Sequence, residues 1–200
     1  MTLAYVRLIL IVAAWALVTY TLWRARRWLL FYLVGALGLI VVVLLAAITM
    51  GWDGWLAGLE ARQVAGLAAV LDLRLSVTGD AGLAIPNHTG WAVFAIGVEC
   101  SALLELSAII GLIVFYPAFS RRRKVTTVVV GGAATYVVNL LRIMIIVAII
   151  NAMGTDWVFA AHAVFGRVFF FVATIGLLWI LITRPTLGLV GRKLAGGQDG

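Results

Sequence analysis

Cysteine, histidine and charged residues of both signs are scarce in this sequence. Cys100 is the only cysteine among 200 residues, so no intramolecular disulfide can form. One cysteine and two histidines on distant segments do not make a recognisable metal-ligand set, and no motif for an organic cofactor is present, so we expect neither. Charged residues make up 12% of the chain and hydrophobic residues 64%, which excludes a soluble globular domain. We therefore expect an integral membrane protein.

Long apolar runs are what the sequence has in place of charge. Each is about 20 residues or longer, enough for a helix to cross a hydrocarbon core of roughly 30 Å. They predict an all-α membrane protein that forms a single domain over residues 1–200. No small-residue cleavage site follows the first run, so we expect the first helix to be retained. The predicted spans lie near residues 3–22, 28–50, 100–119, 125–150 and 159–183.

The basic residues predict how these helices are oriented. The formal net charge of +7 comes mostly from short clusters between the apolar runs, which is typical of topology signals and not of nucleic-acid binding. Such clusters follow the first span, follow the third span and occupy the tail at 184–200, so these regions are expected in the cytoplasm. The N-terminus and the segment 51–99 then lie outside. The clusters are Arg24, Arg26 and Arg27; Arg121, Arg122, Arg123 and Lys124; and Arg184, Arg192 and Lys193.

The extracytoplasmic segment contains two weaker patterns. Residues 55–72 mix apolar residues with Glu60 and Arg62 at helical spacing, which predicts an amphipathic helix at the membrane interface. A sixth span over the same residues remains an alternative, although it would place both charged side chains in lipid. Residues 74–86 alternate weakly around a Gly79-Asp80 turn and predict a short β-hairpin.

Three polar residues on three predicted spans reach a similar depth. Cys100 begins the third span at its outer end, and His162 lies a few residues inside the outer end of the fifth. If the fourth span begins near Val125, Arg142 lies roughly 26 Å further along the helix and thus close to the outer boundary. The sequence therefore predicts that these side chains meet just below the outer surface.

Together these three residue types can carry out nucleophilic catalysis. A thiol is a good nucleophile only as the thiolate, so Cys100 needs a base. His162 is suited to be the general acid and base, because the unperturbed pKa of imidazole is about 6.5. Arg142 stays charged and is assigned to stabilise the thiolate or an oxyanion. Structural interpretations remain open, with Cys100 as a small core residue and His162 as an interhelical hydrogen-bond donor.

Other polar residues near these positions are candidates for supporting roles. Asn139 lies one helical turn before Arg142 and could orient it or bond to a neighbouring helix. Arg142 could instead snorkel to the headgroups or pair with Glu99 or Glu105. Glu99 adjoins the cysteine and is a further supporting candidate. Glu105 and Arg167 lie about 8 Å deeper than Cys100 and His162, and are predicted to form a buried pair that aligns two helices.

The chain resembles the exosortase/archaeosortase group of multi-pass membrane proteins. Their shared pattern is a cysteine after an extracytoplasmic segment, an arginine in a following helix and a histidine in the next. The resemblance spans roughly residues 71–183, and Ala102 occupies a position that is often glycine in the family. The matching stretches are Val98-Glu99-Cys100-Ser101-Ala102, Asn139-Leu140-Leu141-Arg142-Ile143 and Ala161-His162-Ala163-Val164-Phe165-Gly166.

The resemblance implies a membrane-embedded cysteine protease or transpeptidase of the cell membrane. Such an enzyme would cleave C-terminal sorting signals of secreted proteins at the outer face, through a thioester on Cys100, and transfer the product to a surface acceptor. The implied partners are secreted proteins that end in a motif, a transmembrane helix and a basic tail, together with the lipid bilayer and an unidentified acceptor nucleophile.

A function from another class also fits the intramembrane charges. Charged side chains within spans often mark ion or substrate routes. Glu105, Arg142 and Arg167 could line a polar path in a non-enzymatic transporter or membrane-assembly subunit. The two hypotheses differ in whether the function depends on Cys100.

Overall fold

A helical hairpin forms the N-terminal part of the computed structural model, which describes residues 2–187. The helices α1 (Thr2–Arg24) and α2 (Trp28–Met50) pack against each other. Trp15 Nε1 donates a hydrogen bond to the carbonyl oxygen of Val34 at 3.0 Å. Gly38 makes room for this indole, because a Cβ there would overlap Trp15 Nε1. The bounds of both helices agree closely with the first two predicted spans.

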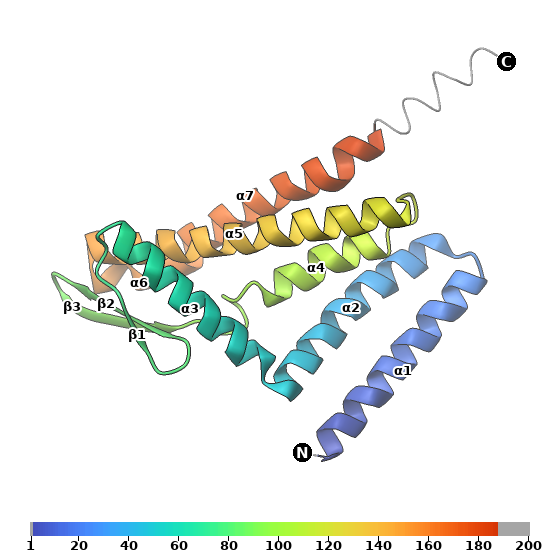
Figure 1. The fold of residues 1–200 in the computed structure, drawn as a ribbon, viewed down its shortest axis with the longest axis horizontal. Helices are drawn as coiled ribbons and strands as arrows, with labels where there is room; N and C mark the ends of the chain where they lie inside the picture. The colour runs from blue at the N-terminus through green and yellow to red at the C-terminus, as the bar shows by residue number, and fades with distance from the viewer. Residues whose placement is uncertain (1, 188–200) are drawn as a thin grey trace, which may run out of the picture.

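Two long helical segments run side by side through the molecule (Figure 1). The helix α5 (Arg121–Met153) contains 33 residues and contacts α3, α4 and α7. The second segment follows a turn at Gly154 and is continuous over Thr155–Leu187, which exceeds the predicted span 159–183 at both ends. Its parts are η1 (Thr155–Trp157), α6 (Val158–Ala160), the π-helical η2 (Ala161–Gly166), α7 (Arg167–Leu178) and η3 (Trp179–Thr183).

The predicted third span at 100–119 is shorter than expected. Its helix, α4 (Leu103–Val114), has 12 residues, which is roughly 18 Å and too short to cross a hydrocarbon core by itself. Cys100 lies in the turn before it. Among residues 2–187, four helical segments are long and apolar enough to span a membrane, and α4 is not one of them. The all-α membrane fold is confirmed, with α4 packed between α2 and α5.

Helix α3 (Trp52–Val70) leaves the hairpin at Gly51, whose φ of 73° lets the chain change direction. It too is absent from the segments able to span a membrane, so the structure does not favour a sixth span. One face of α3 is buried at the spacing of successive helical turns, through Ala57, Ala61, Val64 and Ala68. This face packs against the sheet and α5.

A small antiparallel sheet follows α3, with strand order β1-β2-β3. The expected hairpin at 74–86 is present as β1 (Ser76–Thr78) and β2 (Gly82–Asn87), and β3 (Gly90–Ala95) adds a third strand. The sequence did not predict β3 because Trp91 to Ala95 are all apolar, so no alternation distinguishes the buried Ala92 from the exposed Val93.

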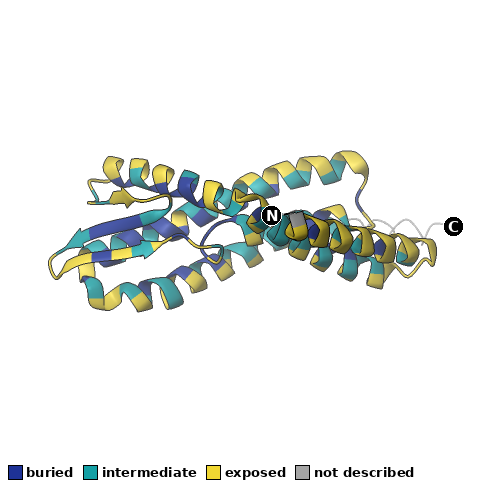
Figure 2. Ribbon diagram, turned by 90° about the horizontal axis from the view of Figure 1, so that it is seen from below, coloured by how far each residue is buried: buried dark blue, intermediate teal, exposed yellow. Residues whose placement is uncertain are grey.

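The core lies at the end of the molecule that carries the sheet. Figure 2 shows buried residues concentrated in the sheet and the helices around it, whereas α1 is mostly exposed. Exposed apolar side chains on the long helices are suited to contact with lipid. Because α5 is roughly 50 Å long by helical rise, it can cross the hydrocarbon core and continue into the region packed by α3 and β2.

Candidate active site

Cys100 lies in a tight turn between β3 and α4. The backbone N–H groups of Cys100 and Ser101 both donate to the carbonyl oxygen of Gly97, each at 2.9 Å. Cys100 is only 4% exposed, and Ser101 and Ala102 are fully buried. The turn thus holds the thiol at the edge of the core, where it packs with side chains such as Ile143 and Ile146 of α5.

His162 is the closest polar partner of this thiol. The Cys100 Sγ lies 3.5 Å from both Nδ1 and Nε2 of the ring. Either nitrogen, when unprotonated, is within reach to accept the thiol proton. His162 is in the π-helical segment η2, whose wider turn is a common feature of functional sites. Gly166 lets this segment approach α5, because a Cβ there would lie 2.9 Å from Ile146 Cδ1.

Two opposing effects act on the Cys100 thiol. Burial raises the pKa of the Cys100 thiol above its ordinary value, and the Arg142 guanidinium acts in the opposite direction. A thiol with a raised pKa is mostly protonated at neutral pH and needs a base at the moment of attack. The position of His162 allows the ring to serve as that base.

Arg142 is buried on the inner face of α5, at 4% exposure. Its Nη1 lies 3.9 Å from Oε1 of Glu105, and its guanidinium carbon lies 5.3 Å from the centre of the Phe170 ring, within cation–π range. The predicted pair of Glu105 with Arg167 is thus replaced by a pair with Arg142. The reason is that Glu105 occupies the first turn of the short α4, whereas Arg167 is exposed.

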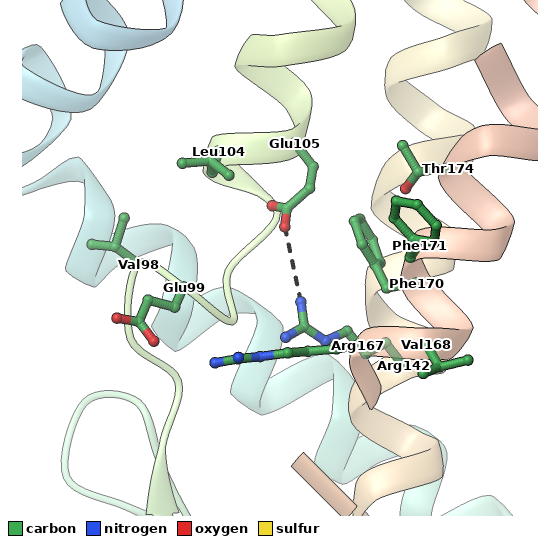
Figure 3. A pocket seen from close by; sticks show the side chains of 10 residues that line it. All are labelled: Val98, Glu99, Leu104, Glu105, Arg142, Arg167, Val168, Phe170, Phe171 and Thr174. Carbon is green, nitrogen blue, oxygen red and sulfur yellow. Dashed lines mark ion pairs between the residues drawn. The ribbon is translucent and has the colours of Figure 1, made fainter. Parts of the chain in front are cut away.

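The ion pair lies in a cavity of about 720 Å³ between α4 and α7. Figure 3 shows Glu105 facing Arg142 across this space, with Phe170 and Phe171 on the α7 side. Arg142 Nε and Glu105 Oε2 are buried and have no hydrogen-bond partner among the described residues. The cavity is lined by Val98, Glu99, Leu104, Glu105, Arg142, Arg167, Val168, Phe170, Phe171 and Thr174.

A second cavity, of about 490 Å³, adjoins the His162 imidazole. His162 lines it together with Phe94 and Ala95 of β3 and with Asp156 near the start of the last helical segment. Arg142 does not line this second cavity and His162 does not line the first. The imidazole and the guanidinium can therefore act on groups that occupy different spaces.

The hydrogen bonds of Asn139 go to the cysteine turn and to α3, and none among the described residues goes to Arg142. The Asn139 Nδ2 donates to the carbonyl oxygen of Cys100 at 2.9 Å and to Glu60 Oε1 at 3.3 Å. The sequence left open whether Asn139 orients Arg142 or bonds to a neighbouring helix. The structure shows the second role, because Glu60 belongs to α3. Glu99 is exposed and lines the first cavity, where its carboxylate forms no ion pair within 4.0 Å with a described residue.

Glu60 is the residue of this region that sequence reasoning missed. The interfacial-helix interpretation treated it as a polar surface residue, yet it is fully buried. Its Oε1 also accepts the N–H of Ala102 at 2.8 Å. The spacing of Ala57, Ala61 and Val64 places position 60 on the buried face of α3, which is the signal that could have found it.

Fold and site together define a class of protein: a multi-pass helical membrane protein with a thiol, an imidazole and a guanidinium gathered where α4, α5 and η2 meet. A model of the transmembrane exosortase family (Exosortase_EpsH) matches residues 1–179, and the chain belongs to this family. Searches of curated proteins and of solved structures found no match. Family membership supports a membrane transpeptidase role in general terms.

Proposed function

We propose that this protein is a cysteine transpeptidase that cleaves C-terminal sorting signals of secreted proteins through a thioester on Cys100. The contact of 3.5 Å between Cys100 Sγ and the His162 ring is the observation that carries the proposal. The position of Arg142 beside the same turn supports it, as does membership of the transmembrane exosortase family.

Cleavage requires two proton transfers at His162. The imidazole takes the thiol proton as Cys100 Sγ attacks the scissile carbonyl, and the electron pair of the C=O bond moves to oxygen. We assign Arg142 to stabilise this oxyanion, because its Nε has no partner among the described residues. Collapse of the intermediate breaks the C–N bond. The imidazolium then protonates the leaving amine, and the acyl group remains as a thioester.

Release from the thioester follows the reverse order of proton transfers. An acceptor nucleophile loses its proton to His162 as it attacks the thioester carbonyl, and the Cys100 thiolate that leaves recovers a proton from the imidazolium. The second cavity places His162 next to space that an acceptor can occupy. If water enters instead of an acceptor, the same steps give hydrolysis.

We place this chemistry at the outer face of the cell membrane, in a single membrane domain with the N-terminus outside and the tail inside. This orientation needs an odd number of crossings, so the short α4 and the residues that flank it must make a fifth crossing beside the four long segments. The basic clusters support this orientation. The length of α5 supports the depth, because roughly 20 residues from Arg121 cross the core and bring the chain to the level of Arg142. Secreted proteins that end in a motif, a transmembrane helix and a basic tail are the proposed substrates.

Processing of a co-expressed substrate tests the proposal. We expect Cys100→Ala to abolish cleavage while the protein remains folded and inserted in the membrane. A mass-spectrometric search for an acyl adduct on wild-type Cys100 tests the thioester directly. Normal processing by Cys100→Ala would sink the proposal.

The alternative of a transporter or assembly subunit has one supporting observation: Glu105, Arg142 and Arg167 line the same cavity. In that case a Glu105→Gln variant would lose function and Cys100→Ala would retain it. Comparing these two variants in the same cells therefore distinguishes the alternatives.

A further inference from the structure

One buried carboxylate organises the backbone on both sides of the cysteine. Glu60 Oε1 accepts the N–H of Ala102 at 2.8 Å and the Nδ2 of Asn139 at 3.3 Å. The same Asn139 Nδ2 donates to the carbonyl oxygen of Cys100 at 2.9 Å. Asn139 thus holds the peptide group between Cys100 and Ser101, and Glu60 holds the one between Ser101 and Ala102.

This carboxylate takes the place of a local helix cap. Ala102 is the N-cap residue of α4 and has no side chain that could bond to the free N–H groups of the first turn. Glu60 supplies an acceptor from α3, 42 residues earlier in the sequence. A carboxylate near a helix N-terminus is also favoured by the helix dipole. The start of α4, and with it the Cys100 turn, is therefore tied to a distant helix.

Simple packing does not account for a carboxylate at this position. Glu60 is fully buried among Ala57, Ala61 and Val64, and its Oε2 has no hydrogen-bond partner among the described residues. Burial of such a group is costly, so an apolar side chain would stabilise the contact between α3 and α5 better. These two helices have another polar link, in which Tyr136 Oη donates to Gln63 Oε1 at 2.8 Å.

We propose that Glu60 is a positioning residue, which holds the Cys100 turn so that the thiol faces His162 and stays shielded from water. The effect on peptide processing rests on the proposed function, whereas the effect on the thiol does not. The role belongs to Glu60 acting through Asn139 and the backbone of Ala102, since its hydrogen bonds go to these two groups and not to the thiol.

Alkylation of the purified full-length protein by iodoacetamide tests the proposal, because Cys100 is the only cysteine and every adduct reports on it. The rate measured against pH yields a limiting value, which reflects access to the thiol, and a midpoint, which reflects its ionisation. We expect Glu60→Ala to raise the limiting rate about tenfold or more, since loss of two hydrogen bonds opens the turn. Glu60→Gln keeps an acceptor oxygen and should stay within about threefold of wild type.

Gln63→Ala is the matched control, because it removes the other polar link between α3 and α5 at an exposed position one turn away. Its limiting rate should equal that of the wild type. The proposal is overturned if Glu60→Ala also stays within about threefold of wild type, or if Gln63→Ala rises as much as Glu60→Ala. If Glu60→Ala does not fold, Glu60→Asp replaces it, because the shorter side chain weakens the same two bonds.

A double variant tests whether the turn is aligned with the imidazole. His162→Ala should shift the alkylation midpoint in the wild-type background and shift it much less beside Glu60→Ala, where the pair is already misaligned. Equal shifts in both backgrounds would contradict alignment by Glu60. Processing separates this inference from the proposed function: if the wild type cleaves no substrate, the transpeptidase proposal fails, while the alkylation result for Glu60 stands.

Discussion

The Cys100 thiol and the His162 imidazole come from positions 62 residues apart, and their reactive atoms lie 3.5 Å from each other. A turn presents the thiol and a π-helical segment presents the ring. Both elements pack against α5, which carries Arg142. The three groups are therefore held together by one long helix.

Loss of the imidazole should affect the thiol before any substrate binds. In His162→Ala the thiol lacks its nearest base, so we expect slower alkylation of Cys100 near neutral pH and a processing rate lower by about 10²–10⁴-fold. His88→Ala is the matched control, because His88 lies in the turn between β2 and β3 and no hydrogen bond joins it to the thiol. Equal losses in both variants would contradict a specific role for His162.

Variants of the ion pair between Arg142 and Glu105 should distinguish the effect of Arg142 on catalysis from its effect on stability. Arg142→Ala leaves a carboxylate without its partner in the protein interior, which we expect to destabilise the fold by about 3 kcal/mol and to slow processing by about 10²–10³-fold. Adding Glu105→Gln removes the unpaired charge. Thermal unfolding in detergent should then recover toward wild type while processing stays low. Recovery of both together would argue that Arg142 is only structural.

Glu60 should make stability depend on pH. Burial, the largest effect, raises the pKa of Glu60 to about 7 from an ordinary value of 4.5, although hydrogen bonds from Ala102 and Asn139 oppose the shift. The folded protein therefore binds this proton more tightly than the unfolded chain. The contribution is complete below about pH 4.5 and is lost as pH rises through about 7, a change of roughly 3 kcal/mol.

Glu60→Gln supplies the comparison for this pH dependence. The amide does not titrate, so the fall in stability between acidic and neutral pH should be smaller in the variant than in the wild type. Thermal unfolding of both proteins over this range measures the difference, because other titrating groups contribute equally to both. Parallel curves would show that Glu60 keeps its ordinary pKa.

The contact between α2 and α4 should be sensitive to a single glycine. A Cβ at Gly111 would lie 2.9 Å from the carbonyl oxygen of Ala36, a backbone atom that cannot rotate away. We expect Gly111→Val to destabilise the protein by about 1–3 kcal/mol, measured by thermal unfolding. Gly176→Ala in α7 is the control, since a Cβ there meets nothing within 4 Å and should be tolerated.

Helix boundaries could be predicted where composition alone decides them. The second predicted span, 28–50, coincides with α2 because uniform apolarity ends at Gly51. The prediction was wrong for 100–119, where α4 contains only Leu103–Val114, because apolarity does not show that a turn holds Cys100 before the helix begins. The bounds of the tail at 184–200 fall mostly outside the described residues.

Site residues could be proposed where lipid makes a polar side chain conspicuous. Arg142 and His162 stand out within apolar runs, and Cys100 stands out as the only cysteine, at the outer end of a predicted span. Glu60 was not conspicuous in this way, because α3 carries other charged residues such as Asp53 and Arg62. The sequence left two partners open for Glu105, Arg167 and Arg142, and the structure shows Arg142, since depth along a helix does not say which way a side chain points.

The amino-acid sequence by itself determined that this chain is a helical membrane protein, because hydrophobic length and basic clusters act locally along the chain. The match to the family model, which is also a property of the sequence, places it in the exosortase family. The tertiary structure decided which polar groups meet. Hydrogen bonds such as those of Glu60 with Ala102 and Asn139 join segments far apart in sequence, and only the packing of α3, α4 and α5 brings them within reach. That packing orients the Cys100 thiol toward His162.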